Sequence, residues 1–170
     1  LAGSSMGGML ALHCALQAPE RVRGLALLGT TARADTPELL RLRSEAIGLF
    51  EAGRMDDVLQ ANLVFAFHPA HVERLAADYR AMVGRAGAPQ LVAQNRAVMA
   101  RADLRPRLAA ITCPTAVVVG EDDRLTPPEC SEELAAALPR ATLQRLPQCG
   151  HLLTWEQPQA VTEALAGWWQ

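Results

Sequence analysis

The chain has no long apolar run, no basic cluster and no paired-cysteine motif. No apolar stretch approaches the roughly 20 residues that cross a membrane, so we expect no membrane-spanning segment. The formal net charge is −2, which disfavours nucleic acids and anionic membrane surfaces as partners. The cysteines show neither a C-x-x-C pair nor zinc-ligand spacing, and we expect reduced, packed thiols in a cytoplasmic protein. They are Cys14, Cys113, Cys130 and Cys149.

An initiating methionine is also absent, and the chain begins inside a motif. We therefore interpret the 170 residues as the C-terminal portion of a longer protein, so the lack of a signal peptide is uninformative. Half of the residues (50%) are hydrophobic, which is enough for one compact domain with a real core. The composition leaves open whether the protein forms a homo-oligomer.

Residues 3–7 read Gly-Ser-Ser-Met-Gly, a G-x-S-x-G pattern centred on Ser5. This pattern is typical of a nucleophile elbow, a sharp turn between a strand and a helix that presents a strained serine above a sheet. We expect a Cβ atom at either Gly3 or Gly7 to collide with the backbone across the turn. A flexible Gly/Ser loop is the alternative interpretation of so short a motif.

The residues after the motif favour the elbow. An apolar stretch of helical period covers residues 9–16, and an apolar run over residues 22–28 follows and ends at Gly29. Turn, helix and strand in this order are what an elbow requires downstream. The strand that should precede the turn is missing from this prediction, since only Leu1 and Ala2 remain before it.

The whole sequence divides into three segments. Residues 1–35 carry the turn, helix and strand, and residues 36–105 show mainly helical signals. Residues 106–170 again show strand patterns that alternate with helix patterns. Alternating strands and helices predict an α/β fold with a parallel sheet, and the middle segment reads as a helical insertion. Thr126 to Glu129 has the form of a capping box. The patterns predict helices at about 36–52, 55–66, 70–85, 89–101, 126–138 and from about 158, and strands at 115–119 and 141–146.

Acidic and histidine residues follow the ends of the two predicted strands in the last segment. Asp122 and Asp123 come after strand 115–119, and His151 comes after strand 141–146. Functional groups gather at the carboxyl ends of strands in open α/β sheets. A serine nucleophile needs a base within hydrogen-bond reach, and that base needs an orienting acid. The sequence therefore supplies a serine, an acid and a histidine, in that order.

At these residues the chain resembles the α/β-hydrolase superfamily. The resemblance rests on G-x-S-x-G around Ser5, on G-x-x-D-x-x-x-P over residues 120–127, and on the pair Gly150-His151. It covers nearly all of the chain, with residues 36–105 matching the family's helical lid and the flanking segments matching its parallel-sheet core. Within the superfamily the chain most resembles the lid-bearing esterase and enol-lactonase group, which includes 3-oxoadipate enol-lactonase.

The resemblance implies a role for each motif residue. Ser5 would attack an acyl carbonyl, His151 would take and return the proton, and Asp123 would hold the imidazole. The backbone N–H of Met6 would be one donor of the oxyanion hole, while the second donor would lie upstream of residue 1. The implied reaction is hydrolysis of a small-molecule carboxylic ester or lactone, with no cofactor and no metal.

Several candidate residues keep an alternative interpretation. Asp122 competes with Asp123 for the role of the acid, and Asp35 is a third candidate. A surface-loop or helix-capping role fits Asp35 better. His68 and His71 are spaced as a metal pair, but no further ligand cluster accompanies them, so we favour loop chemistry.

Side chains of the predicted lid could line an apolar acyl pocket, although packing between helices explains each of them equally well. Arginines of the same segment could receive a substrate carboxylate, but solvated helix faces explain most of them. Trp155 could form a wall of the site, with core packing as the better explanation. The lid candidates are Phe50, Phe65, Phe67, Met55, Met82 and Met99, with the arginines Arg43, Arg96 and Arg101.

Two other functions remain open. In similar families the same triad cleaves C–C bonds of ring-fission products or supports cofactor-free perhydrolysis. A non-catalytic ligand receptor on the same fold is the alternative from another class. The complete set of Ser5, Asp123 and His151 disfavours the receptor, since a receptor has less need of all three groups.

Overall fold

The computed structural model describes residues 1–169, so Gln170, the last residue of the predicted segment 106–170, lies outside the described residues. Four strands form one sheet in the order β1-β2-β3-β4, and every neighbouring pair is parallel. Because helices connect these parallel strands, the predicted α/β class is confirmed. The strands are β1 (Ala2–Ser4), β2 (Leu25–Leu28), β3 (Thr115–Gly120) and β4 (Ala141–Leu146).

Strand β1 corrects one expectation. The strand before the elbow is present, and its residues Ala2 and Ser4 pair in parallel with Ala26 and Leu28 of β2. Three residues suffice because β2, buried along its whole length, supplies the hydrogen-bonding edge that aligns them.

The helices follow the predicted order with one difference, the short helix α6, which was not predicted. Two helices were predicted over residues 70–85 and 89–101, and α4 indeed consists of two helical stretches that meet at a kink. The kink lies at Gly87, whose φ of 76° departs from helical geometry. The helices are α1 (Met6–Gln17), α2 (Pro37–Glu51), α3 (Met55–Ala66), α4 (Pro69–Met99), α5 (Pro128–Ala137), α6 (Leu153–Glu156) and α7 (Pro158–Trp169), with 3₁₀ turns η1 (Pro19–Arg21) and η2 (Arg105–Ala110).

The sheet buries apolar side chains on both of its faces. Leu27 and Val117 belong to a cluster that includes residues of α1 and α5, whereas the next residues, Leu28 and Val118, pack with residues of α6 and α7. Successive side chains of a strand point to opposite faces, so a strand covered on both sides must be apolar throughout. This explains the Val-rich run of β3, all six residues of which are buried.

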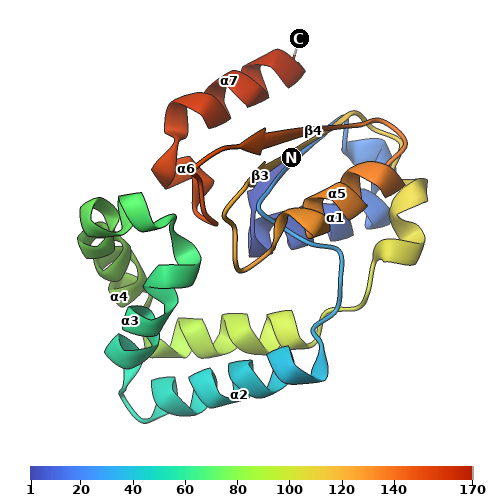
Figure 1. Ribbon diagram of the computed structural model, residues 1–170. Coiled ribbons are helices and arrows are strands. Elements are labelled where there is room, and N and C mark those ends of the chain that lie inside the picture. The colour runs from blue at the N-terminus through green and yellow to red at the C-terminus, as the bar shows by residue number, and fades with distance from the viewer. Residues whose placement is uncertain (170) are drawn as a thin grey trace.

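Helices α2, α3 and α4 stand between β2 and β3 in the chain and lie beside the sheet core (Figure 1). We call residues 37–99 the helical segment. It has apolar clusters of its own, one around Phe50 and one around Phe67. Within residues 1–169, no helix combines the length and the apolar character that a membrane span requires.

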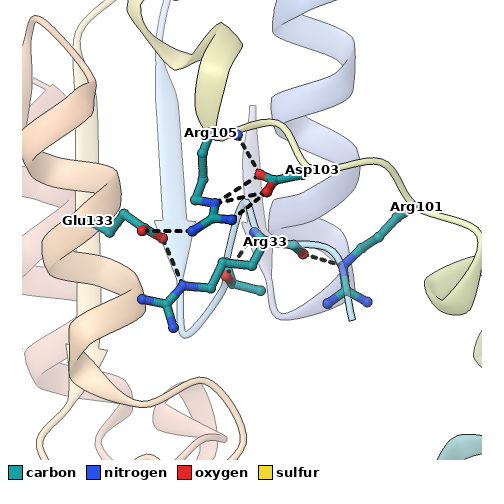
Figure 2. Close-up of polar contacts among 6 residues, drawn as sticks. Arg33, Arg101, Asp103, Arg105 and Glu133 are labelled. Carbon is teal, nitrogen blue, oxygen red and sulfur yellow. Dashed lines mark hydrogen bonds and ion pairs between the residues drawn. The ribbon is translucent and has the colours of Figure 1, made fainter. Parts of the chain in front are cut away.

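The base of the helical segment is tied to the core by polar contacts (Figure 2). Just after α4, Arg101 Nε donates to the carbonyl oxygen of Arg33, 2.8 Å away, on the linker that precedes α2. Arg33 and Arg105 both contact Glu133 of α5, at 2.9 and 3.4 Å. Arg105 also pairs with Asp103. The two linkers of the helical segment are therefore joined to each other and to the core.

Candidate active site

Ser5 lies at the turn between β1 and α1. Its φ of 52° falls in the left-handed region, which is rare for a residue with a side chain and marks a strained position. An added Cβ atom at Gly3 would collide with the backbone of Gly7. The same expectation for Gly7 was wrong, because an added Cβ there would meet no described atom within 4 Å. The close approach therefore demands glycine on only one side of the turn.

Thr30 supports the elbow from the loop after β2. Its hydroxyl, fully buried, donates to the carbonyl oxygen of Ser5 at 2.7 Å. The same oxygen accepts the backbone N–H groups of Gly8 and Met9. A Cβ atom at Gly8 would lie 2.7 Å from the Thr30 side chain, which explains the glycine at that position. Sequence reasoning did not single out Thr30.

The Asp123 carboxylate lies in the loop after β3 and is fully buried, with 0% of its side chain exposed. Its Oδ1 accepts the backbone N–H groups of Leu125 and Thr126, each at 2.9 Å. The Thr126 hydroxyl donates to Oδ2 at 2.9 Å. These donors offset the cost of burying the carboxylate and fix its orientation.

His151 lies between Asp123 and Ser5. Its Nδ1 is 2.9 Å from Asp123 Oδ2, and its Nε2 is 2.8 Å from Ser5 Oγ. Because Asp123 accepts from its other neighbours, we assign the imidazole proton to Nδ1, which leaves Nε2 free to accept from the serine. The structure thus brings together the three side chains that the sequence nominated from three separate loops.

Thr126 was wrongly assigned as a helix cap. The N-cap of α5 is Pro127, and no side chain caps that helix. The Thr126 hydroxyl instead bonds to Asp123 and lies 3.3 Å from His151 Nδ1. Its position three residues after the acid is the sequence signal that could have assigned it to the site.

Cys149, two residues before His151, is buried. Burial raises the pKa of its thiol to about 12, and the nearby carboxylates of Glu156, Asp123 and Asp122 add to the effect. Both causes disfavour the thiolate, which is the reactive form of cysteine. Cys149 is therefore a packed neutral thiol next to the site, and all four cysteines are free.

The competing acids lie elsewhere. Asp122 is exposed, and its carboxylate lies 3.8 Å from His68 Nε2. Asp35 was expected in a surface loop or as a helix cap, but the N-cap of α2 is Thr36. None of the Asp35 side chain is exposed (0%), because Arg43 and Arg101 both form ion pairs with it, at 2.6 and 2.8 Å. Asp35 therefore belongs to the base of the helical segment.

The side chains of His68 and His71 have separate partners. His68 caps α4 through Nδ1, which accepts the Ala70 N–H at 3.2 Å. His71 Nδ1 lies 3.0 Å from Glu156 Oε2. Among residues 1–169 no group of three or more histidine, cysteine, aspartate or glutamate side chains is placed to hold a metal ion.

The candidate residues of the helical segment differ in their surroundings. Phe50 and Phe67 are buried in the clusters of that segment, whereas 44% of Phe65 is exposed. Trp155 packs against the Phe67 cluster. Arg43 and Arg101 are held by Asp35, as described above. Arg96 pairs with Glu51 at 2.9 Å. All three arginines therefore have acidic partners.

Three characterised proteins resemble the chain over nearly its whole length. The structure of an esterase from Thermogutta terrifontis superposes on the chain with a TM-score of 0.93 at 30% sequence identity. The match covers 99% of this chain and 63% of the esterase. An enol-lactonase from Burkholderia xenovorans gives a TM-score of 0.88 at 27% identity, covering 98% of this chain and 64% of its own. A pimeloyl-[acyl-carrier protein] methyl ester esterase from Chromobacterium violaceum is 30% identical over 171 residues, which are 96% of this chain and 67% of that protein.

The chain therefore spans 63–67% of the length of these three proteins. The family described as the alpha/beta hydrolase fold matches residues 1–158, which include the elbow, the helical segment and the loop with His151. The superpositions on the esterase and the enol-lactonase agree with this match, since they cover the parallel sheet and its flanking helices. The chain belongs to the α/β-hydrolase fold family.

Proposed function

We propose that the protein is a serine hydrolase that cleaves a carboxylic ester or lactone through an acyl-enzyme on Ser5. One observation carries the proposal. Ser5 Oγ, His151 and Asp123 form a continuous hydrogen-bonded chain, with 2.8 Å from Oγ to Nε2 and 2.9 Å from Nδ1 to the carboxylate. A nucleophile, a base and an orienting acid at these distances are the groups that acyl transfer requires.

The first half of the reaction forms the acyl-enzyme. Ser5 Oγ attacks the carbonyl carbon while its proton moves to His151 Nε2, and the carbonyl oxygen gains the negative charge. Met6, the first residue of α1, has an N–H without a partner inside the helix, and we assign it as one donor to that oxygen. When the tetrahedral intermediate collapses, the leaving alkoxide takes the proton from Nε2.

The second half reverses these roles with water. Nε2 of His151 accepts a proton from water as the oxygen attacks the acyl carbon, and the returning proton restores the Ser5 hydroxyl. Through both halves Asp123 accepts the Nδ1 proton and stabilises the imidazolium. Protein groups alone perform the proton transfers, so the proposed reaction needs no cofactor.

We further propose that the helical segment acts as a lid over an apolar acyl group. Phe65 and Leu125 are exposed, at 44% and 47%. Each is next in sequence to a residue that contacts the site, since Ala66 bonds to His151 and Thr126 bonds to Asp123. Arg43, Arg96 and Arg101, the candidates for binding a substrate carboxylate, are instead paired with acids of the chain, which favours an uncharged substrate.

The test is labelling by a fluorophosphonate, which reacts with activated serines. In the full-length protein we expect a single adduct on Ser5 by peptide mapping, and none in Ser5→Ala or His151→Ala variants that remain folded. Rates on aryl esters, enol-lactones and vinylogous diketones then separate ester or lactone hydrolysis from C–C cleavage. A folded protein that binds a ligand tightly but forms no adduct would instead support the receptor function.

A further inference from the structure

Glu156, the last residue of α6, has a fully buried carboxylate, with 0% of its side chain exposed. Its Oε1 accepts the backbone N–H of Gly150 at 3.0 Å. Its Oε2 accepts the backbone N–H of His68 at 2.8 Å and lies 3.0 Å from His71 Nδ1. The carboxylate therefore bridges the loop that carries His151 and the first turn of α4. The proposed reaction does not use this group.

The loop itself is anchored through three successive backbone N–H groups. Gly150 donates to Glu156, while His151 and Leu152 both donate to the carbonyl oxygen of Ala66, at 3.1 and 3.0 Å. Ala66 is the last residue of α3. Every one of these acceptors is either part of the helical segment or bonded to it. The position of the imidazole is thus set by the boundary between α3 and α4.

The contact at Gly150 leaves no room for a side chain. An added Cβ atom would lie 2.6 Å from the backbone nitrogen of His68 and 2.7 Å from the carbonyl carbon of Phe67. The backbone of the loop therefore touches the backbone of the helical segment directly. A displacement of one must displace the other, because packed backbone cannot give way as a flexible side chain can.

A buried carboxylate is a costly way to fill space, since apolar packing of the same volume would often stabilise the fold more. We explain the buried carboxylate by its hydrogen-bonding geometry. Its two oxygens accept hydrogen bonds from the histidine loop and from the start of α4, and these bonds keep the two segments aligned. The alignment matters for catalysis, because misplacing a reacting group by about 1 Å can reduce the rate about 10²-fold.

We propose that Glu156 is a positioning residue for His151, and that the start of α4 controls the catalytic base through it. Glu156 holds Gly150 and His68 in a fixed relation, which keeps His151 Nε2 in reach of Ser5 Oγ. This inference rests on the proposed hydrolase function. It assigns no contact between Glu156 and substrate.

The decisive variant is Glu156→Gln in the full-length protein. The amide nitrogen of glutamine cannot accept a hydrogen bond, so in either orientation one of the bonds from Gly150 and His68 is lost. We expect the rate constant of Ser5 phosphonylation, measured per folded molecule, to fall about 10- to 100-fold. For ester substrates kcat should fall by the same factor, with KM changing much less. The low-field proton NMR signal of His151 Nδ1–H should shift.

Asp35→Asn is the matched control. Its carboxylate is equally buried and also joins the helical segment to its linkers, through Arg43 and Arg101. It has no contact with Gly150 or His151. We expect this variant to lose stability while its labelling rate per folded molecule stays within about twofold of the wild type.

The outcomes separate the two proposals. A wild-type protein that forms no adduct on Ser5 would reject the hydrolase function. A labelled wild type with an equally fast Glu156→Gln variant and an unshifted Nδ1–H signal would overturn the positioning role and leave Glu156 with stability alone. If Glu156→Gln does not fold, His71→Ala carries the test, since it removes the side-chain contact to Oε2 and the ring contact with His68 but leaves the backbone bonds from Gly150 and His68 to Glu156. Its kcat should fall a few-fold, and an unchanged kcat would overturn the inference.

Discussion

The helical segment is held to the rest of the chain at two joints that are built from different kinds of contact. At the histidine-loop joint, Ala66 and Glu156 accept backbone N–H groups from the loop that carries His151. At the base joint, Arg43 and Arg101 form side-chain ion pairs with Asp35. Backbone bonds transmit a displacement directly, whereas arginine side chains can adjust along their flexible stems. We therefore expect the first joint to affect catalysis and the second to affect stability.

The largest effect is expected from Gly150→Ala. The new methyl group would overlap the backbone of His68 and Phe67, so the loop or the start of α4 must move. Because His151 is the next residue, the rate of Ser5 labelling per folded molecule should fall at least about 10²-fold. The time course of labelling with a fluorophosphonate, quenched at successive times, measures this rate.

Gly84→Ala provides the control for that substitution. Gly84 lies within α4, and an added Cβ atom there would meet no described atom within 4 Å. Alanine also favours a helix by about 1 kcal/mol over glycine, so stability should not fall. Equal labelling rates for Gly150→Ala and Gly84→Ala would show that the close contact at Gly150 does not affect catalysis.

The next effect is at the base joint. Asp35→Asn leaves Arg101, whose side chain is only 10% exposed, without its anionic partner. Hydrogen bonds to charged groups contribute about 1.5–3 kcal/mol each, so we expect the free energy of unfolding to fall by about 2 kcal/mol. Urea denaturation measures the change, and the midpoint should shift without a change in slope. If Asp35→Asn is as stable as the wild type but is labelled more slowly, the base joint affects catalysis and not stability, contrary to our expectation.

The catalytic side chains and the two joints differ in how much of them the sequence predicts. Ser5, Asp123 and His151 could be nominated because each occupies a local pattern at the end of a strand, and parallel strands place such ends at one edge. The structure places these side chains in hydrogen-bond contact. The helix and strand order was predicted for the same reason, since it depends on local periodicity.

Contacts between distant residues could not be predicted in this way. His71 meets Glu156 across 85 residues of sequence, and the spacing of His68 and His71 suggested only loop chemistry. Asp35 was expected at the surface because its neighbours are polar, yet two arginines bury it. A single sequence gives the types of these residues but not the partners that tertiary packing selects.

A third effect tests the burial of the histidine loop through Cys149. Burial raises the pKa of this thiol from 9.0 to about 12 in the folded chain. Above pH 9 the unfolded chain therefore loses a proton that the folded chain retains, so the stability this thiol contributes is complete below pH 9 and is lost as the pH rises toward 12. Between pH 8 and pH 10 the wild type should lose about 1 kcal/mol more than Cys149→Ala. If the free energies of unfolding of the two proteins change equally with pH, the thiol is accessible to solvent in the folded chain.

The smallest effect is expected at the solvent-exposed side of the base joint, where Glu133 of α5 contacts Arg33 and Arg105 (Figure 2). The hydrogen bond that Arg33 Nε donates to Glu133 is the main cause that raises the pKa of Arg33. The Arg33 side chain is 42% exposed, so solvent and salt screen the pair. Glu133→Gln should lower the free energy of unfolding by about 0.5 kcal/mol, and added salt should reduce the difference. A salt-independent loss as large as that of Asp35→Asn would mean that the outer contacts hold the helical segment as firmly as the buried pair does.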